Sequence, residues 1–394
     1  MESPVAKAFV VSDDLELPPN SLTALDGVAV VTGDLFGRGI QALFRNFLAG
    51  RDVNNGIAGL TDEAGFLRAV RRLTDSIYAH TGAARILDVS PMNPGVIDRI
   101  AAVYPDAALI RTPADADVVA RQWAEPAEPP APLPEVKPLA GPPIFIVGVP
   151  RSATTWVENM LLAHPAIAGP EVETSVFLSL RALRDNVRRP DGVSTFISET
   201  DFVVALRGFV AGLFGEWLDA VGRREARFLE KTPLHAEHLP LIAEVFPDAA
   251  IIGIHRDGRD VVRSLLEMDA ATNDVVVAAK AWTDITRAVS AAVATMPNAR
   301  DERYEAMLRD PVSSVIELLR WLGLDVDAAT TEEVQRRSGE RVSQYNTTGD
   351  VGPGKWASLS ARELREVYRH AGARLVELGY VTEDELPRRR WWRR

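Results

Sequence analysis

The chain contains no cysteine among its 394 residues. This excludes disulfide bonds and metal sites built on thiolates, and it permits a reducing compartment. No apolar run approaches the roughly 18 residues that a membrane-spanning helix needs. The acidic start, with Glu2 and Asp13, does not match a secretory signal peptide. We therefore expect a protein without a membrane span, located in the cytoplasm.

Positive charge is also scarce. The chain has 44 lysines and arginines against 55 aspartates and glutamates, which gives a formal net charge of −11. The negative electrostatic potential of such a chain disfavours binding to nucleic acid and to anionic membrane surfaces, so we expect neither as a partner. An anionic ligand has to be held by individual cations against this field. With 46% hydrophobic residues, the composition is that of an ordinary globular protein.

Residues 143–165 are the most informative stretch. Residues 144–147 (IFIV) form an apolar run typical of a buried strand. Gly148 ends this run, and a short polar turn leads into apolar residues at helical spacing that stop at His164. A strand, a tight loop and a helix N-terminus in this order make an anion cradle, because first-turn N–H groups lack intrahelical partners and the helix dipole adds positive potential.

The loop departs from the phosphate loop of nucleoside triphosphatases, G-x-x-x-x-G-K-[ST]. Ala153, Thr154 and Thr155 occupy the places of its second glycine, lysine and hydroxyl residue. The cation, Arg151, comes earlier in the loop. A nucleotide kinase would be poorly equipped by this loop, yet it stays an alternative.

The same loop resembles that of the sulfotransferases that use 3′-phosphoadenosine 5′-phosphosulfate (PAPS), including tyrosylprotein, heparan-type and bacterial members. Their pattern is P-[RK]-S-G-T-T-W. The matching residues are Pro150, Arg151, Ser152, Thr154, Thr155 and Trp156, and Ala153 replaces the usual glycine. Because an alanine is strained at positive φ, we expect Ala153 to stay right-handed. The resemblance implies that these seven residues bind the donor, with Trp156 stacked on adenine.

A second motif follows a predicted strand at residues 250–255. The sequence RDGRDVVRS, residues 256–264, resembles the 3′-phosphate motif of the same family. The resemblance implies that Arg256 and Ser264 bind the 3′-phosphate of the donor from different sides. Arginine–phosphate contacts are charge-assisted and can be bidentate. Lys355, in a glycine-rich loop where relatives close over the donor, is a further candidate.

Three residues are candidates for the transfer step. The resemblance implies that Lys231, with Arg151, offsets charge on the transferring group, and that Glu173 takes the proton of the acceptor. Glu171 is the competing base. A base suits the reaction because a hydroxyl must lose its proton as it attacks sulfur. Two nearby histidines, His235 and His238, are interpreted as surface or pocket-rim residues.

The two halves of the chain share an internal repeat. Residues 85–110 and 227–252 align without gaps and are identical at 11 of 26 positions. Residues 28–48 also have the strand–glycine–helix outline of residues 144–162.

The first copy lacks the cations of the second. Val89 aligns with Lys231 and Ala114 with Arg256. We therefore interpret residues 1–124 as a degenerate pseudo-domain that binds no donor. The proline-rich residues 125–143 act as a linker to a catalytic domain at residues 144–394.

The expected fold is α/β, a three-layer, P-loop-like domain with a mainly parallel sheet between helices, preceded by the smaller pseudo-repeat. The resemblance implies in-line transfer of a sulfuryl group from PAPS to a hydroxyl or amine of a small-molecule, carbohydrate or peptide acceptor. The product is 3′-phosphoadenosine 5′-phosphate (PAP), and no metal is expected. A non-catalytic regulatory protein that binds PAPS or PAP is a second alternative. A homodimer or an intramolecular pseudo-dimer is possible, and the role of the tail, residues 388–394 (RRRWWRR), is open.

Overall fold

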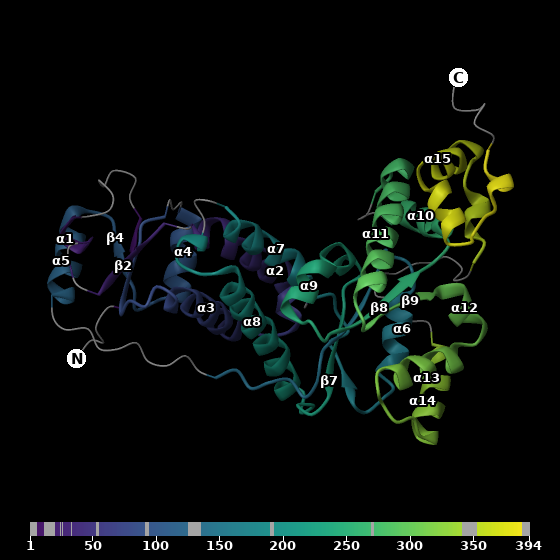
Figure 1. Ribbon diagram of the computed structural model, residues 1–394, viewed down its shortest axis with the longest axis horizontal. Helices are drawn as coiled ribbons and strands as arrows, with labels where there is room; N and C mark the ends of the chain where they lie inside the picture. Colours follow the sequence, from purple (N-terminus) through teal and green to yellow (C-terminus); the bar gives the residue numbers. More distant parts are fainter. Residues whose placement is uncertain are drawn as a thin grey trace. The chain divides into compact units, whose positions relative to one another are not determined.

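The chain divides into two compact units in a computed structural model (Figure 1). Unit 1 comprises residues 1–139 and 174–224, and unit 2 comprises residues 140–173 and 225–394. The structure describes residues 6–11, 20–23, 25, 27–32, 34–52, 55–90, 94–124, 135–189, 193–268, 272–340 and 353–387. Within these ranges, no helix is both long and apolar enough to cross a membrane.

Unit 1 contains a four-stranded sheet in the order β2-β3-β1-β4, and its paired strands are parallel. The strands are β1 (Lys7–Val10), β2 (Val28–Val31), β3 (Arg85–Asp88) and β4 (Ala108–Ile110). Their apolar residues face helices on both sides. One face packs on α1 (Asn20–Thr23) and α5 (Pro113–Trp123) through residues such as Leu22 and Trp123. On the other, Phe9 contacts the rings of Phe36 and Tyr104, near α3 (Glu63–Ala79) and α4 (Pro94–Val103).

A group of helices completes unit 1, and Figure 1 shows α2 beside α7 and α3 beside α8. These elements are η1 (Leu35–Ile40), α2 (Gln41–Arg51), η2 (Gly56–Gly59), α7 (Val176–Val187), η3 (Val193–Thr195) and α8 (Glu199–Ala220). An ion pair between Arg72 and Glu216 joins α3 to α8.

The expected single domain at residues 144–394 is therefore wrong, because residues 174–224 belong to unit 1. The reason is the apolar side of α8. Its residues Phe202, Leu206 and Phe209 are at most 3% exposed, and the helix packs on α3, which lies far earlier in the sequence. Burial of this side against α3 joins the segment to the N-terminal residues.

Unit 2 contains a five-stranded sheet in the order β6-β7-β5-β8-β9, again with parallel pairs. Its strands are β5 (Ile144–Gly148), β6 (Ile167–Ala168), β7 (Arg227–Lys231), β8 (Ala250–His255) and β9 (Ala299–Arg303). Strand β5 is central and fully buried, and Ile144 lies opposite Leu229 and Ala250. A continuous apolar run of this kind is typical of a parallel strand covered on both faces.

Helices cover both faces of this sheet (Figure 1). One layer packs on Ile144 and Ile146 of β5 and consists of α6 (Thr154–Leu161), α12 (Tyr304–Arg309), α13 (Pro311–Trp321) and α14 (Ala328–Ser338). The other consists of η4 (Pro233–His238), α9 (Leu239–Val245), α10 (Gly258–Leu266), α11 (Val275–Thr295) and α15 (Ala361–Glu377). Short turns η5 (Lys355–Ser358) and η6 (Glu383–Glu385) follow. This confirms the α/β prediction for the fold.

Two predicted segments lie partly outside the described residues. Residues 135–143 of the linker have no helix or strand, whereas residues 125–134 are not described. The tail at residues 388–394 and residues 349–352 of the glycine-rich loop are likewise not described.

Candidate active site

Three cations stand at the carboxyl ends of three neighbouring strands of unit 2. Arg151 follows β5, Lys231 ends β7 and Arg256 follows β8. Because β7, β5 and β8 are adjacent and parallel, their carboxyl ends meet at one edge of the sheet. Ligands of open α/β sheets bind at this edge. The structure therefore brings together residues that the sequence separates by about a hundred positions.

Gly148 lets the loop after β5 begin in close contact with β8. Its φ angle is 155°, and a side-chain carbon at this position would lie 2.4 Å from the carbonyl oxygen of Ile254. That carbonyl belongs to a neighbouring strand and has little room to move. The loop thus requires glycine here, for space as well as conformation.

The loop contains two left-handed residues, Arg151 with φ of 77° and Ala153 with φ of 72°. The expectation that Ala153 stays right-handed is therefore wrong. The tight turn between β5 and α6 overrides the residue preference, and within it the N–H of Ser152 donates a hydrogen bond to the carbonyl oxygen of Val149 at 3.0 Å. Ala153 immediately precedes α6, so the first-turn N–H groups of that helix adjoin the loop, and such groups suit an anion.

Ser152 lies at the centre of this loop and is fully buried. Its hydroxyl oxygen has no hydrogen-bond partner among the residues that the structure describes. A buried hydroxyl without a partner costs about 1–3 kcal/mol. An oxyanion in the loop would satisfy this hydroxyl, which is the fit expected of a phosphosulfate site. Thr154 is buried beside it and Thr155 is half-buried.

Arg151 connects the two predicted halves of the donor site. Its Nε donates a hydrogen bond to the hydroxyl of Ser264 at 3.0 Å, and its carbonyl oxygen accepts one from Nη1 of Arg256 at 3.4 Å. Arg256 and Ser264 thus both contact Arg151. Their approach to a 3′-phosphate from different sides stays a prediction.

Arg256 is buried to 7% exposure and held in place by several groups. Its Nη2 lies 3.7 Å from an oxygen of Asp260, and its guanidinium lies 5.0 Å from the ring centroid of Tyr304. Its carbonyl oxygen accepts a hydrogen bond from the indole of Trp282 at 3.1 Å. A cation fixed in this way keeps its orientation without a ligand.

Asp260 also fixes the segment that contains Lys355. Its two carboxylate oxygens accept hydrogen bonds from the backbone N–H groups of Gly354 at 2.9 Å and Trp356 at 2.8 Å. The ring of Trp356 lies 4.2 Å from the guanidinium of Arg259. Lys355 is thereby held at the start of α10, beside the Arg256 motif.

The predicted pair for the transfer step is in contact. Nζ of Lys231 is fully buried and lies 3.3 Å from Oε1 of Glu173, whose side chain is 22% exposed. The side chain of the competing base, Glu171, is exposed. The geometry favours Glu173 over Glu171 as the carboxylate beside Lys231.

A third carboxyl group near the lysine was not predicted from the sequence. Oε2 of Glu158, on α6, is 3.7 Å from Nζ of Lys231. Burial raises the pKa of Glu158 to about 8, and the nearby lysine only partly opposes this shift. A signal was present, because Thr154, Val157, Glu158 and Leu161 share the spacing of a buried helical stripe.

Trp156 is engaged within the protein. Its indole Nε1 donates to the carbonyl oxygen of Ser338 at 3.1 Å, and its ring meets that of Tyr304 at an interplanar angle of 81°. Through these contacts Trp156 links α6 to α14 and α12, so it contributes to the packing of the helices. Stacking on adenine stays a prediction.

The two histidines are buried, so their interpretation as surface or rim residues is wrong. His235 has no exposed surface and His238 is 7% exposed. Nδ1 of His235 lies 2.7 Å from a carboxylate oxygen of Glu230, whose other oxygen accepts the hydroxyl of Thr232 at 2.6 Å. This network braces the end of β7 just beside Lys231.

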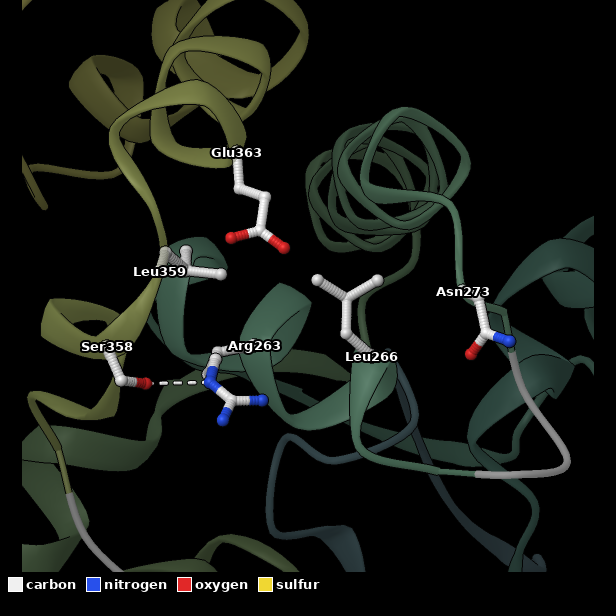
Figure 2. Close-up of a pocket in the computed structure, with 6 residues that line it drawn as sticks. All are labelled: Arg263, Leu266, Asn273, Ser358, Leu359 and Glu363. Atoms are coloured by element: carbon white, nitrogen blue, oxygen red, sulfur yellow. Dashed lines mark hydrogen bonds between the residues drawn. The ribbon is translucent and has the colours of Figure 1, made fainter.

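A small pocket of about 310 Å³ lies next to the predicted 3′-phosphate motif (Figure 2). It is lined by Arg263, Leu266, Asn273, Ser358, Leu359 and Glu363. Figure 2 shows Arg263 joined to Ser358, and the Nε–Oγ distance is 2.7 Å. None of the predicted donor residues lines it. Across the described ranges, no group of three or more histidines and acids is arranged to hold a metal.

Comparison with known proteins relates this part of the sequence to a family. Residues 142–328, which contain the loop, Glu173, Lys231 and Arg256, match the model of the sulfotransferase family. This part of the chain is thus similar to the sulfotransferases.

Curated relatives of the chain have related names. It is 26% identical over 276 residues to the nodulation protein NoeE of Sinorhizobium fredii, covering 60% of this chain and 65% of that protein. It is 27% identical over 268 residues to protein-tyrosine sulfotransferase 1 of Danio rerio, covering 62% and 74%. Among solved structures, mouse sulfotransferase SULT7A1 complexed with PAP is 18% identical, with a TM-score of 0.38, covering 61% of this chain and 88% of that one. The chain thus spans just under two thirds of the length of the nodulation protein.

Proposed function

We propose that this protein is a sulfotransferase that moves a sulfuryl group from PAPS to an acceptor hydroxyl or amine, leaving PAP. The observation that carries the proposal is the contact between Lys231 and Glu173 at the sheet edge where Arg151 and Arg256 also lie. A cation for the transferring group and a carboxylate for the acceptor proton thus stand together. The match of residues 142–328 to the model of the sulfotransferase family supports the same reaction.

The donor would be held by backbone and side-chain groups of unit 2. The loop from Pro150 to Trp156 would bind the 5′-phosphosulfate through the buried hydroxyl of Ser152 and the N–H groups of Thr154 and Thr155 at the start of α6. Arg256 and Ser264, both in contact with Arg151, would bind the 3′-phosphate. Lys355 stands at the start of α10 and is placed to add charge there.

The transfer itself would need few protein groups. A bond forms between the acceptor oxygen and sulfur while the bond from sulfur to the 5′-phosphate oxygen breaks. Glu173 takes the acceptor proton, and PAP leaves with the electron pair. Lys231 offsets negative charge on the moving oxygens, and such preorganised electrostatic groups are commonly worth about 10²–10³ in rate.

The two alternatives account for fewer of these observations. A nucleotide kinase needs a lysine in the loop and oxygen ligands for Mg²⁺, whereas Thr154 stands at the lysine position. A regulatory protein that only binds PAPS or PAP would need the arginines but not a buried lysine against Glu173. The contact at 3.3 Å therefore favours the enzyme.

The acceptor class is left to experiment, and three kinds fit the proposal. The name of the Danio rerio relative suggests a tyrosine peptide, and carbohydrate and small-molecule hydroxyls are the others. Location in the cytoplasm and dimerisation stay predictions.

The proposed function can be tested with PAPS that carries radioactive sulfur. Purified protein would be incubated with this donor and with three acceptors in parallel: an acidic tyrosine peptide, a chitin oligosaccharide and a simple phenol. We expect label in at least one acceptor together with formation of PAP, and none with the Glu173→Gln variant. Transfer of label from radioactive ATP with Mg²⁺ would support the kinase instead. Tight PAP binding without any transfer would support the regulatory protein.

A further inference from the structure

Glu158 has no part in the reaction described above, yet it lies directly behind its central cation. It sits on α6, four residues after the donor loop reaches Thr154, and is 2% exposed. Its Oε2 is 3.7 Å from Nζ of Lys231. Its Oε1 is buried and has no hydrogen-bond partner among the described residues. Burial of a carboxyl group costs free energy unless hydrogen bonds or ion pairs compensate for it.

Lys231 is therefore close to two carboxyl groups. Glu173, at 3.3 Å, is partly exposed, and Glu158, at 3.7 Å, is buried. In the proposed reaction Glu173 accepts a proton and loses its charge. The charge state of Glu158 then decides how much of the lysine's positive charge remains available to the donor and to the departing PAP.

We propose that Glu158 is a positioning residue that holds the Lys231 ammonium beside Glu173 and, by binding or releasing one proton, sets the net charge that this site presents to the donor. The consequence for the donor rests on the proposed function. The proton equilibrium of Glu158 does not, and it can be measured without any donor.

The surroundings of Glu158 support this assignment. Burial is the largest cause that raises its pKa to about 8; Lys231 lowers it, and three further carboxylates raise it. These carboxylates are Glu230 on β7 and Glu173 and Glu171 in the loop before α7.

Lys231 is the cation among the groups that most strongly shift the pKa of Glu158. From α14, Arg337 bonds to the carbonyl oxygen of the neighbouring Asn159 at 3.0 Å. On α6 itself, Val157 and Leu161 belong to the sheet core with Ile146 and Leu229.

The charge of the site then depends on pH in a defined direction. Below about pH 8 Glu158 carries its proton, so it adds no negative charge beside the ion pair of Lys231 with Glu173. Above this pH the proton of Glu158 passes to solvent, and a second negative charge appears behind the lysine. The site then attracts the anionic donor less.

The first test measures the affinity for PAP by titration calorimetry between pH 7.0 and 9.5, where the phosphates of PAP are already ionised. The wild type is compared with Glu158→Gln and with a control, Glu237→Gln, which makes the same change at an exposed site on η4. We expect the wild type and the control to lose roughly three- to tenfold in affinity through pH 8, as one added charge nearby would cause. Glu158→Gln should keep its affinity. The same pH dependence in all three proteins would overturn the proposal.

The second test needs no ligand and separates this proposal from the proposed function. Protein labelled with ¹³C at glutamate carboxyl carbons is titrated by NMR, and the signal missing in Glu158→Gln identifies Glu158. We expect this signal to titrate near pH 8, and at still higher pH in Lys231→Met, which lacks the cation that lowers the pKa. A Glu158 signal that titrates between pH 4 and 5 would overturn the proposal even if PAP binds. A signal near pH 8 in a protein that binds no PAP would leave it standing and contradict the donor assignment.

Discussion

The two units have the same strand order but different chemistry at the strand ends. The order β2-β3-β1-β4 of unit 1 corresponds, strand by strand, to β6-β7-β5-β8 of unit 2. By this correspondence β1 is the counterpart of β5. The expected match of residues 28–48 to residues 144–162 is therefore out of register, and the counterpart of the donor loop begins after Val11, largely outside the described residues. The repeat itself stays a prediction.

The end of β3 in unit 1 corresponds to the end of β7 in unit 2, where Lys231 lies, but it has different residues. Asp88 accepts hydrogen bonds from the hydroxyl of Tyr78 at 2.7 Å and the backbone N–H of Ser90 at 2.9 Å. Val89, between Asp88 and Ser90, aligns with Lys231. It is apolar, whereas the last residue of β7 is the cation Lys231. The acid of unit 1 is thus satisfied by its own neighbours, and the matching edge of unit 2 combines an unpartnered hydroxyl, Ser152, with a buried cation. A shared fold does not by itself make a site; the residues at the strand ends do.

The end of β4 refines the comparison. Arg111 immediately precedes the N-cap of α5, as Arg256 immediately precedes the N-cap of α10. Unit 1 therefore has a cation near this place, which the ungapped alignment with Ala114 did not show. Arg111 is exposed, however, while Arg256 is buried and fixed by Asp260. Orientation distinguishes the two arginines, since both carry the same charge.

The largest effect is expected at the proposed base. Glu173→Gln should lower turnover by about 10²–10⁴-fold, because the acceptor then lacks a group to take its proton, while PAP affinity changes little. Steady-state rates and PAP titration measure the two quantities. The matched variant Glu171→Gln should stay within a few-fold of the wild type. If Glu171→Gln instead shows the large loss of turnover, Glu171 and not Glu173 is the base.

Removal of the buried cation should be nearly as severe. Lys231→Ala is expected to lower turnover by about 10²–10³-fold, because charge on the transferring group is no longer offset. Lys280→Ala, at an exposed position on α11, is the control for loss of one lysine. Equal activity of the two variants would erase the contrast between Lys231 and Val89 on which the comparison of the units rests.

Stability should respond to Glu158 in a pH-dependent way. Its pKa is raised from 4.5 to about 8 by burial, so the unfolded chain releases this proton at lower pH than the folded protein. The free energy of unfolding contributed by this group is therefore lost as pH rises from about 4.5 to 8. Glu158→Gln should be more stable than the wild type by a few kcal/mol at pH 8, on the order of what such a shift implies, and nearly equal at pH 4.5. Denaturant unfolding at both pH values measures this, and a constant difference would contradict it.

Much of the candidate donor site could be proposed from the sequence because its residues are consecutive. The loop from Pro150 to Trp156 and the motif from Arg256 to Ser264 each lie on one short segment, so sequence order carries their spatial order. The role of Glu158 could not be predicted in the same way, since its environment depends on β7. The conformation of Ala153 was missed because loop geometry overrode its preference for negative φ.

The boundaries of the two units depend on contacts between segments far apart in the sequence, which local sequence patterns do not predict. The apolar side of α8 shows that the helix is buried, but not against which element. Its partner, α3, lies more than a hundred residues earlier. A proline-rich linker was therefore taken as the boundary, although residues 174–224 return to unit 1.

Arg256→Ala should weaken binding of PAP by roughly 1.5–3 kcal/mol, the scale of a lost charge-assisted hydrogen bond. Adenosine 5′-phosphosulfate, which lacks the 3′-phosphate, should be affected much less. Arg111→Ala, the counterpart in unit 1, should leave both affinities unchanged. Calorimetric titration of the three proteins with both ligands measures these values, and equal losses for the two ligands would remove Arg256 from the 3′ site.

The smallest effect is expected at the left-handed alanine. Ala153→Gly should stabilise the protein by at most about 1 kcal/mol, because glycine adopts positive φ without strain but loses more chain entropy on folding. Thermal unfolding of the variant, compared with Ala163→Gly near the end of the same helix, measures the difference. A destabilised Ala153→Gly would show that the loop does not hold this residue under strain.

The central claim, that the donor binds at the sheet edge of unit 2 and not in unit 1, is tested most directly by photoaffinity mapping. The full chain is irradiated with 8-azido-PAP, digested, and analysed by mass spectrometry, with excess PAP as competitor. The account predicts labelled peptides within residues 140–173 and 225–394, with labelling suppressed by PAP and by Arg256→Ala. Label that PAP suppresses but that falls within residues 1–139 would contradict it.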